Sequence, residues 1–292
     1  GGEAQPLRVA VVGDMGIVGA EQTFGLLERM AEDVDFVLHL GDIAYADDDF
    51  LERPFVFGYE KKWDNFMHMA SEAFATRVPY MVVPGNHEAE CHSPACQVSP
   101  RKLRALSNFA AYNTRFHMPS VPSGGARSMW YSFNAGTVHF VVINTETDFP
   151  LAPGDKYTFY WRTNGHFGDQ MAWLDQDLAK ANAERHLRPW VVVAGHRPMY
   201  CQAHQDIVGR PTEETRRLRE AFEPLLQRYG VDLYLSGHVH TYERSCPVFA
   251  GETGADYRSG PADDGYSSSW GQGSEEEDEA VAAGAGVAPA AA

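Results

Sequence analysis

Five short apolar runs in this chain each end in a glycine that is followed by a residue able to bind a metal ion. The residues after the glycines are Asp14, Asp42, Asn86, His196 and His238, the last being followed two positions later by His240. The runs have the length and the β-branched content that are typical of buried strands. A glycine at such a place indicates a sharp turn with the backbone close to another group. Because ligands bind beyond the carboxyl ends of the strands in open α/β sheets, the five ends predict one shared site.

The residue types at the strand ends predict a site for two metal ions. Carboxylate and amide oxygens suit hard cations, and imidazole suits iron, zinc and manganese. Asp42 could bridge two ions through its two oxygens, and the alternation of His238 and His240 lets each serve a different ion. Two ions about 3.5–4 Å apart would clamp the attacking and leaving oxygens of an in-line phosphoryl transfer. They would also lower the pKa of a bound water and so supply a hydroxide nucleophile.

The order of strand-like and helix-like segments predicts a layered α/β fold with helices outside the sheets. Apolar residues at helical spacing predict helices over residues 19–32, 59–75, 100–116, 168–186 and 212–229. Thr212 is expected to cap the last of these, and Gly230 to end it. Residues 129–133 and 137–143 flank a turn sequence and predict a β-hairpin. Two sheets packed face to face and covered by helices would accommodate all these elements.

Charge and composition limit the classes of function. The net charge of −16 argues against a nucleic-acid-binding surface, and no apolar stretch approaches the ~20 residues that span a membrane. Half of the negative charge lies in residues 252–292, which contain nine acidic residues and a single arginine. We therefore expect a catalytic domain over residues 1–251 and a disordered acidic tail over 252–292. The first residues lack the basic and apolar regions of a secretory signal.

The four cysteines leave two interpretations open. They allow two disulfides, and Cys91 and Cys96 are close enough in sequence to close a small loop. They are equally compatible with four thiols, since cysteine is often simply buried.

The motifs together resemble the purple acid phosphatases of the metallophosphoesterase superfamily, and they have features of its fungal-type high-molecular-weight members. The similarity covers about residues 7–249, and only the catalytic domain of that family is represented. The matching segments are Gly13-Asp14-Met15-Gly16, Gly41-Asp42-Ile43-Ala44-Tyr45-Ala46-Asp47, Gly85-Asn86-His87-Glu88, Ala194-Gly195-His196-Arg197-Pro198-Met199-Tyr200 and Gly237-His238-Val239-His240-Thr241-Tyr242-Glu243-Arg244. The resemblance implies a four-layer α/β/β/α sandwich. The family's C-terminal closing strands have no clear counterpart after Phe249, so we expect an exposed sheet edge.

Two positions favour iron at one half of the site. Most metallophosphoesterases have a histidine two residues after the first aspartate, where this chain has Gly16, and the second motif instead carries Tyr45. A phenol with an ordinary pKa near ~10 ionises at low pH only beside a strong cation, which favours Fe³⁺. Alone, Tyr45 would more simply be a packed aromatic residue with a hydrogen-bonded hydroxyl.

Carried over residue by residue, the resemblance implies a complete set of metal ligands. The iron ligands are Asp14, Asp42, Tyr45 and His240, and the ligands of one divalent ion (Zn, Mn or Fe) are Asp42, Asn86, His196 and His238. His87 matches the family's phosphate-contacting histidine. His204 is the candidate general acid for the leaving group, because it is the histidine of the loop after the fourth motif.

The resemblance implies an acid phosphatase that hydrolyses small-molecule phosphate monoesters by in-line attack of a metal-bound hydroxide at an Fe(III)–M(II) centre. It also implies a secreted or vacuolar/lysosomal protein and allows a homodimer. Two alternatives remain. One is a metallophosphodiesterase or nucleotidase with a Mn or Zn pair, against which Gly16 and Tyr45 argue. The other is a truncated, poorly active binding module, against which the intact ligand set argues.

Overall fold

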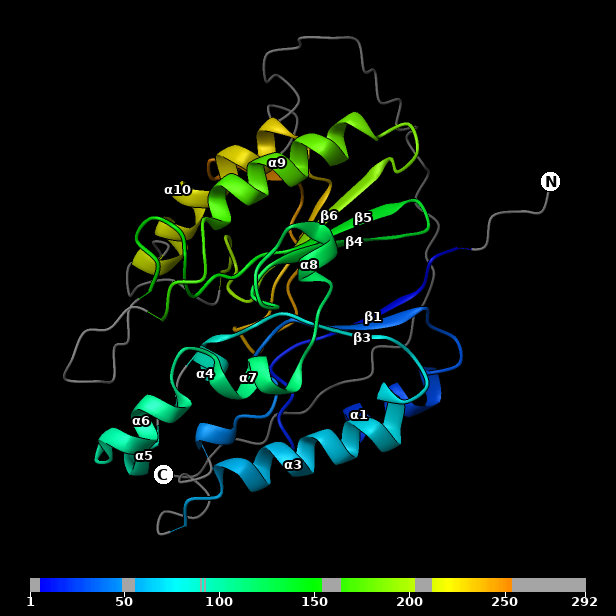
Figure 1. The fold of residues 1–292 in the computed structure, drawn as a ribbon. Helices are drawn as coiled ribbons and strands as arrows, with labels where there is room; N and C mark the ends of the chain where they lie inside the picture. The colour runs from blue at the N-terminus through cyan, green and yellow to red at the C-terminus, as the bar shows by residue number, and fades with distance from the viewer. Residues whose placement is uncertain are drawn as a thin grey trace.

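Two β-sheets, each covered by helices on its outer face, form the body of the protein (Figure 1). The computed structural model describes residues 6–48, 56–89, 91, 93–153, 164–202 and 212–253. The first sheet is parallel and has the order β1 (Val9–Val12), β2 (Phe36–His39), β3 (Tyr80–Val82). The second sheet has the order β4 (Tyr131–Ala135), β5 (Val138–Val142), β6 (Trp190–Ala194), β7 (Leu233–Leu235). Its first pair is the expected antiparallel hairpin, and the other pairs are parallel.

Alternate residues of the central strands enter different hydrophobic cores. Phe36 and Leu38 of β2 lie between the two sheets, where they pack with Phe140 and other residues of the second sheet. Each of these three residues is at most 5% exposed. Val37, which lies between them, belongs to the core under the helices of the first sheet. Val141 of β5 likewise belongs to the core on the helical side of the second sheet. Side chains of a strand point alternately to its two faces, so three cores separate four layers. The predicted α/β/β/α sandwich is confirmed.

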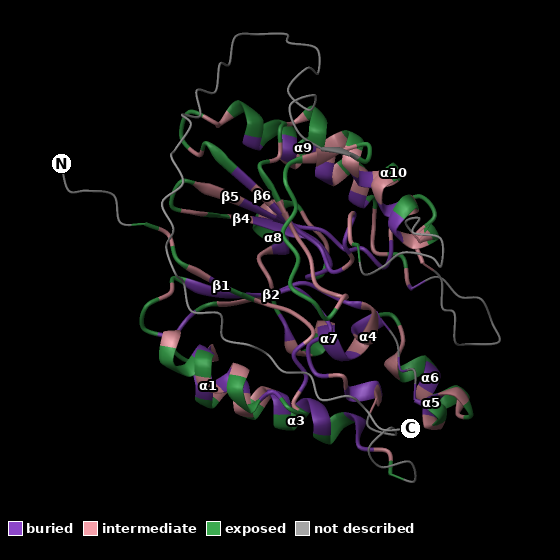
Figure 2. Ribbon diagram, turned by 180° about the vertical axis from the view of Figure 1, so that it is seen from behind, coloured by how far each residue is buried: buried purple, intermediate pink, exposed green. Residues whose placement is uncertain are grey.

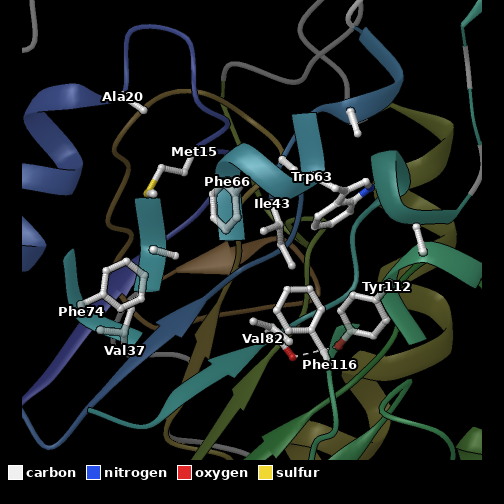
Figure 3. Packing of buried hydrophobic residues seen from close by; sticks show 14 of the residues in the cluster. Met15, Ala20, Val37, Ile43, Trp63, Phe66, Phe74, Val82, Tyr112 and Phe116 are labelled. Atoms are coloured by element: carbon white, nitrogen blue, oxygen red, sulfur yellow. Dashed lines mark hydrogen bonds between the residues drawn. The ribbon is translucent and has the colours of Figure 1, made fainter. Parts of the chain in front are cut away.

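Long helices form the two outer layers (Figure 2). Helices α1 (Glu21–Met30) and α3 (Tyr59–Ala70) cover the first sheet, and α3 continues into a π-helical segment, η2 (Ser71–Ala75). Helices α9 (Gln170–Ala183) and α10 (Glu213–Arg228) cover the second sheet. Figure 3 shows Trp63 and Phe66 of α3 packed over the first sheet, each at most 1% exposed. As expected, the Thr212 side chain caps α10 by accepting from the Thr215 backbone N–H at 3.4 Å.

One predicted helix is wrong in its extent. Residues 100–116 divide into α6 (Pro100–Leu106) and α7 (Ala110–Arg115). Asn108 and Phe109 between them have φ of 57° and 55°, a left-handed conformation that an α-helix does not contain. The remaining helical segments of the described residues are single turns or little more. They are η1 (Ala46–Asp48), α4 (Asn86–Ala89), α5 (Pro94–Gln97) and α8 (Ser120–Ser123).

β7 lies at the edge of the second sheet within the described residues, and its Leu233 is 50% exposed. The expected exposed edge is therefore present in this part of the chain. A separate hairpin follows, formed by β8 (Val248–Phe249) and β9 (Glu252–Thr253), the latter just past the predicted domain boundary. Residues 254–292 lie outside the described residues, so the predicted disorder of the tail stays a prediction.

The structure settles part of the cysteine question. Cys91 and Cys96 form a disulfide, as their spacing allowed, and both are fully buried. Cys201 and Cys246 form no disulfide. Within the described part of the chain, no helix has the length and apolar character needed to cross a membrane.

Candidate metal centre

The carboxyl ends of five strands, three from the first sheet and two from the second, meet at one place. Several hydrogen bonds join the sheets there, two of them to backbone groups. His196 Nδ1 donates to the Leu40 carbonyl at 2.7 Å, and the His238 backbone N–H donates to Asp14 Oδ2 at 2.8 Å. The motifs that contain Asp14, Asp42, His196 and His238 therefore lie together, as their positions at strand ends predicted. The His87 backbone N–H adds the third motif by donating to Asp42 Oδ1 at 2.9 Å.

The glycines before the ligands are required by this close approach. A Cβ on Gly41 would lie 2.6 Å from His196 Nδ1, and one on Gly237 would lie 2.5 Å from Asp14 Oδ2. Real Cβ atoms do not approach other atoms so closely, and the neighbours here belong to the site itself. Larger residues at these positions would push the predicted ligands apart.

Four predicted ligands have left-handed backbone, which is uncommon for residues other than glycine. The φ angles are 54° for Asp14, 51° for Asp42, 48° for Tyr45 and 69° for His238. Such conformations cost about 1–3 kcal/mol each and concentrate at functional sites. The backbone conformations of these four residues therefore lower the stability of the fold, and their side chains lie in the site.

Asp14, Tyr45 and His240, three of the predicted iron ligands, lie together at one side of the candidate centre. The Tyr45 hydroxyl lies 2.8 Å from His240 Nε2 and 3.2 Å from Asp14 Oδ1, and His240 Nε2 lies 3.5 Å from the same Asp14 oxygen. Burial, together with the charges of Asp42 and Asp14, raises the pKa of Tyr45 far above its ordinary value. The phenol is therefore neutral beside these carboxylates alone. A strong cation among the three oxygen and nitrogen donors would reverse that balance, which is how Fe³⁺ stabilises a phenolate.

Gly16 and Tyr45, which the sequence singled out together, are in contact. The Gly16 backbone N–H donates to the Ile43 carbonyl at 3.0 Å, and a Cβ on Gly16 would lie 3.2 Å from Cδ2 of the Tyr45 ring. With φ of 58°, Gly16 also has a conformation that other residues rarely adopt. A Cβ at position 16 would therefore crowd the tyrosine ring, which would have to shift by a few tenths of an ångström. Together with the left-handed backbone, this crowding disfavours a histidine at position 16 beside this placement of Tyr45.

Asp42, Asn86, His196 and His238, the predicted ligands of the divalent ion, lie together at the other side of the candidate centre. His196 Nε2 lies 3.1 Å from Asp42 Oδ2, 3.0 Å from Asn86 Oδ1 and 3.2 Å from His238 Nδ1. One ligand atom each from Asp42, His196 and His238 lies within 4.8 Å of the others, as a shared ion requires. Because His196 Nδ1 donates to a backbone carbonyl, its Nε2 is the nitrogen directed at the candidate site, which is the usual arrangement of a metal-binding histidine.

The electrostatics of this half also fit a cation. Burial by itself lowers the pKa of His196, but the charge and hydrogen bond of Asp42 outweigh it and raise that pKa to about 10. The same pairing holds the pKa of Asp42 well below its ordinary range, against the opposing effect of burial. His238 differs, because burial and the nearby Arg197 lower its pKa to about 3. The site thus combines a buried carboxylate, an amide oxygen and imidazole donors, which suits a divalent zinc, manganese or iron ion.

Glu88 connects two of the ligand loops, a role that the sequence did not indicate. Its buried carboxylate accepts backbone N–H groups from Asp42 at 2.8 Å, Ile43 at 2.8 Å and Gly85 at 2.9 Å. Burial and the charge of Asp42 raise the pKa of Glu88 to about 8, although the backbone donors act in the opposite direction. Glu88 is part of the third motif, but a glutamate in a sequence is expected to be exposed, and nothing in the motif predicts that this one is only 1% exposed.

Asp47 positions His87. His87 Nδ1 lies 2.9 and 3.0 Å from the two Asp47 carboxylate oxygens, and Asp47 is fully buried. Burial lowers the pKa of His87, but Asp47 outweighs it and raises the value to about 9. His87 therefore carries a positive charge at the site, with its Nε2 3.9 Å from Asp42 Oδ2. The predicted general acid, His204, lies outside the described residues.

Comparison with known proteins gives one family. The model of the calcineurin-like phosphoesterases matches residues 7–242. The acid phosphatase of Aspergillus ficuum is 32% identical and matches 86% of this chain and 55% of its own length. The acid phosphatase A of Cryphonectria parasitica is 33% identical over 85% of this chain and 58% of its own length. Human acid phosphatase type 7 is 34% identical over 83% of this chain and 48% of its own length.

A solved structure agrees with these relatives. The purple acid phosphatase PPD1 from yellow lupin seeds superposes with a TM-score of 0.62 at 28% identity. The match covers 85% of this chain and 40% of the lupin chain. The chain spans about half the length of the curated relatives it matches.

Proposed function

This chain belongs to the calcineurin-like phosphoesterase family, and within that family we propose that it is an acid phosphatase acting on small-molecule phosphate monoesters. The relatives named as acid phosphatases support the reaction class. The contact between Gly16 and the Tyr45 ring carries the choice within the family. It combines with the approach of the Tyr45 hydroxyl to His240 and Asp14 to favour an iron site of the purple acid phosphatase kind.

The residues of the proposed centre would hold Fe(III) and one divalent ion, Zn, Mn or Fe, and Asp42 belongs to both ligand sets. When bound, the two ions supply positive charge that activates a water for in-line attack on phosphorus and offsets charge on the phosphoryl oxygens. The iron ligands are Asp14, Asp42, Tyr45 and His240, and the divalent-ion ligands are Asp42, Asn86, His196 and His238. The distances among their donor atoms support this division into two halves.

The protein's own residues complete the proposed mechanism. His87, charged through its bond to Asp47, would bind a phosphoryl oxygen and so orient the ester. His204 would protonate the departing alkoxide as the general acid. Glu88 would keep the Asp42 and Asn86 loops in fixed relation during turnover, since it holds the backbone of both.

Two proposals about location and partners accompany the activity. A disulfide between Cys91 and Cys96 supports an oxidising compartment, in line with a secreted or vacuolar/lysosomal protein. The net charge of −16 supports small phosphate esters rather than nucleic acid as partners. A homodimer stays a prediction.

One observation favours a second candidate, a poorly active module with an incompletely held iron site. The His240 side chain is 65% exposed, and the residues that follow it, 241–247, are exposed throughout. An exposed ligand is less firmly positioned than the buried His196. Such a module would bind the divalent ion and leave iron loosely held.

Hydrolysis assays on metal-reconstituted protein separate these functions. The acid phosphatase should hydrolyse 4-nitrophenyl phosphate faster than bis(4-nitrophenyl) phosphate, and Asp42→Asn should abolish the reaction. Asp169→Asn is the matched control, because Asp169 also follows a glycine but caps α9 instead. A preference for the diester with manganese would favour a phosphodiesterase. A metal-loaded protein without either activity would favour the module.

A further inference from the structure

A cavity of about 710 Å³ lies outside the candidate metal centre, between α7, α8 and the loop that precedes α9. This volume is in the range of sites that hold small organic molecules. None of the described residues that line it is a predicted metal ligand or the predicted phosphate-contacting His87. Figure 1 shows α7 on the side of the first sheet and α8 beside the second. The cavity therefore lies where the two halves of the sandwich meet.

The wall of the cavity carries positive charge, although the chain as a whole has a net charge of −16. Arg127, His117 and His166 line the cavity, and no aspartate or glutamate is among its described lining residues. No described residue pairs with the Arg127 guanidinium. A guanidinium has five N–H donors and no acceptor. Free donors and a positive charge in an acidic protein suit an anion.

Large apolar side chains complete the wall. Phe116, Met118, Val121 and Phe167 line the same space as Arg127, and Val121 is 89% exposed. An inorganic ion would leave such side chains in contact with water. An organic anion with an aromatic body would cover them, and burial of apolar surface would then add to its affinity.

Hydrogen bonds fix the segment that carries Arg127. The neighbouring Ser128 is 4% exposed, and its Oγ donates to the Phe116 carbonyl at 3.1 Å and accepts from the Met118 backbone N–H at 3.0 Å. The Ser128 carbonyl accepts from the Tyr112 hydroxyl of α7 at 3.0 Å. The backbone beside Arg127 is thus bonded to two other parts of the wall, so the guanidinium starts from a fixed position.

The backbone of the wall is left-handed at three residues other than glycine. The φ angles are 57° for Asn108, 43° for Arg127 and 62° for Ser128, and all three residues line the cavity. Such backbone is costly and concentrates at functional sites. The candidate metal centre has the same feature at four of its predicted ligands.

A buried carboxylate fixes the loop that precedes α9. Asp148 Oδ1 lies 2.7 Å from His166 Nδ1, and the same oxygen accepts from the Phe167 backbone N–H at 3.1 Å. The Asp148 side chain is fully buried, whereas that of His166 is 86% exposed. The His166 ring therefore lies at the opening of the cavity and is held from below.

We propose that this cavity is a second ligand site, which binds a small organic anion with an aromatic body and contacts its charged group through Arg127. The inference goes beyond the proposed function and does not depend on it. The site nevertheless adjoins the metal centre through the backbone. The Phe109 N–H, directly before α7, donates at 3.1 Å to the carbonyl of Ala89, the last residue of α4, which also contains Asn86 and His87.

Fluorescence titration of the full-length chain with anilinonaphthalene sulfonate tests the proposal. This probe joins an aromatic body to a sulfonate, and phenylnaphthylamine has the same body without the charge. The wild type should bind the sulfonate saturably, and Arg127→Gln should bind it about 10-fold more weakly, the lower end for a hydrogen bond to a charged group because Arg127 is exposed. The neutral probe should bind both proteins equally.

Two further variants locate the binding. Arg104→Gln is the matched control, because Arg104 of α6 is also exposed and does not line the cavity. It should keep the wild-type affinity for both probes. Ala110→Phe places a larger side chain in the lining and should weaken the binding of both probes. If Ala110→Phe fails to fold, the two arginine variants still test the proposal, since both replace exposed side chains.

The outcomes separate this inference from the proposed function. Equal losses in Arg127→Gln and Arg104→Gln would reduce the effect to net charge and overturn the inference. Wild-type affinity for the sulfonate in Arg127→Gln would overturn it as well, and that result includes a sulfonate bound at the metal centre. A chain that hydrolyses no phosphate ester would overturn the proposed function and leave this inference in place.

Discussion

Replacing Asp47 by asparagine should destabilise the protein in acid but not in alkali. The Asp47 carboxylate holds His87 Nδ1 at 2.9 Å, and it outweighs burial to raise the pKa of His87 to about 9 from an ordinary 6.5. An amide keeps the shape of the carboxylate but not its charge. In Asp47→Asn, the charges of Asp42 and Asp48 still favour the protonated ring, but burial opposes them without the Asp47 bond, so the pKa of His87 falls.

The sign follows from proton linkage. A histidine whose pKa is higher in the folded than in the unfolded protein binds more protons when folded, so it stabilises the fold below its unfolded pKa. That contribution is complete below about pH 6.5 and is lost as the pH rises through about 9. With 1.36 kcal/mol for each pKa unit, it amounts to roughly 3 kcal/mol. The His87 side chain is only 17% exposed, so solvent screens this pairing little.

Urea denaturation of chelator-stripped protein at about pH 6 and about pH 10 measures the effect. Asp47→Asn should be less stable than the wild type by as much as roughly 3 kcal/mol at the lower pH and nearly equal to it at the higher one. Asp48→Asn is the control, because Asp48 lies 3.9 Å from the same nitrogen and is more exposed. A loss of stability in Asp47→Asn that is the same at both pH values would refute the electrostatic reasoning and reduce Asp47 to a packing role.

Three further predictions concern the glycines, the core and the disulfide. Gly85→Ala should abolish metal binding, because its Cβ would collide with the Asp42 side chain and backbone. Gly19→Ala has open space around its Cβ, so its free energy of unfolding should fall by only about 1–2 kcal/mol. Metal content after dialysis and urea denaturation check both variants. Leu38→Ala should lose about 2–5 kcal/mol in urea denaturation, since Leu38 is fully buried between the sheets. Removing the bridge by replacing Cys91 and Cys96 with alanine should cost about 2 kcal/mol by the loop-entropy estimate, and alkylation with intact mass should show two protected cysteines in the wild type.

Much of the fold could be predicted because the strands are short and strongly apolar. The run that contains Phe36 and Leu38 marks β2 without ambiguity, since a fully buried parallel strand is apolar on both faces. Because every residue of such a strand is apolar, the sequence does not show which face of the sheet each side chain lies on. The division into two outer cores and one inner core could therefore not be predicted. The break at Asn108 and Phe109 was missed because apolar spacing continues across it, while the left-handed backbone depends on tertiary packing.

The candidate site divides in a similar way. Residues at strand ends were predictable, because topology alone brings Asp14, Asp42 and His196 to one edge of the sandwich. The buried carboxylates of Glu88 and Glu146 were not, since their partners come from loops whose course the sequence does not specify. A glutamate in a loop is most often exposed, and only the positions of the surrounding donors show otherwise.

The visible absorption spectrum of the iron-loaded protein tests the central claim, that Tyr45 has replaced a histidine at position 16 as a ligand of Fe³⁺. The wild type should show a tyrosinate-to-iron charge-transfer band, and Tyr45→Phe should lose that band at equal iron content. A band that persists in Tyr45→Phe, or a folded wild type that holds iron without any such band, would contradict the claim.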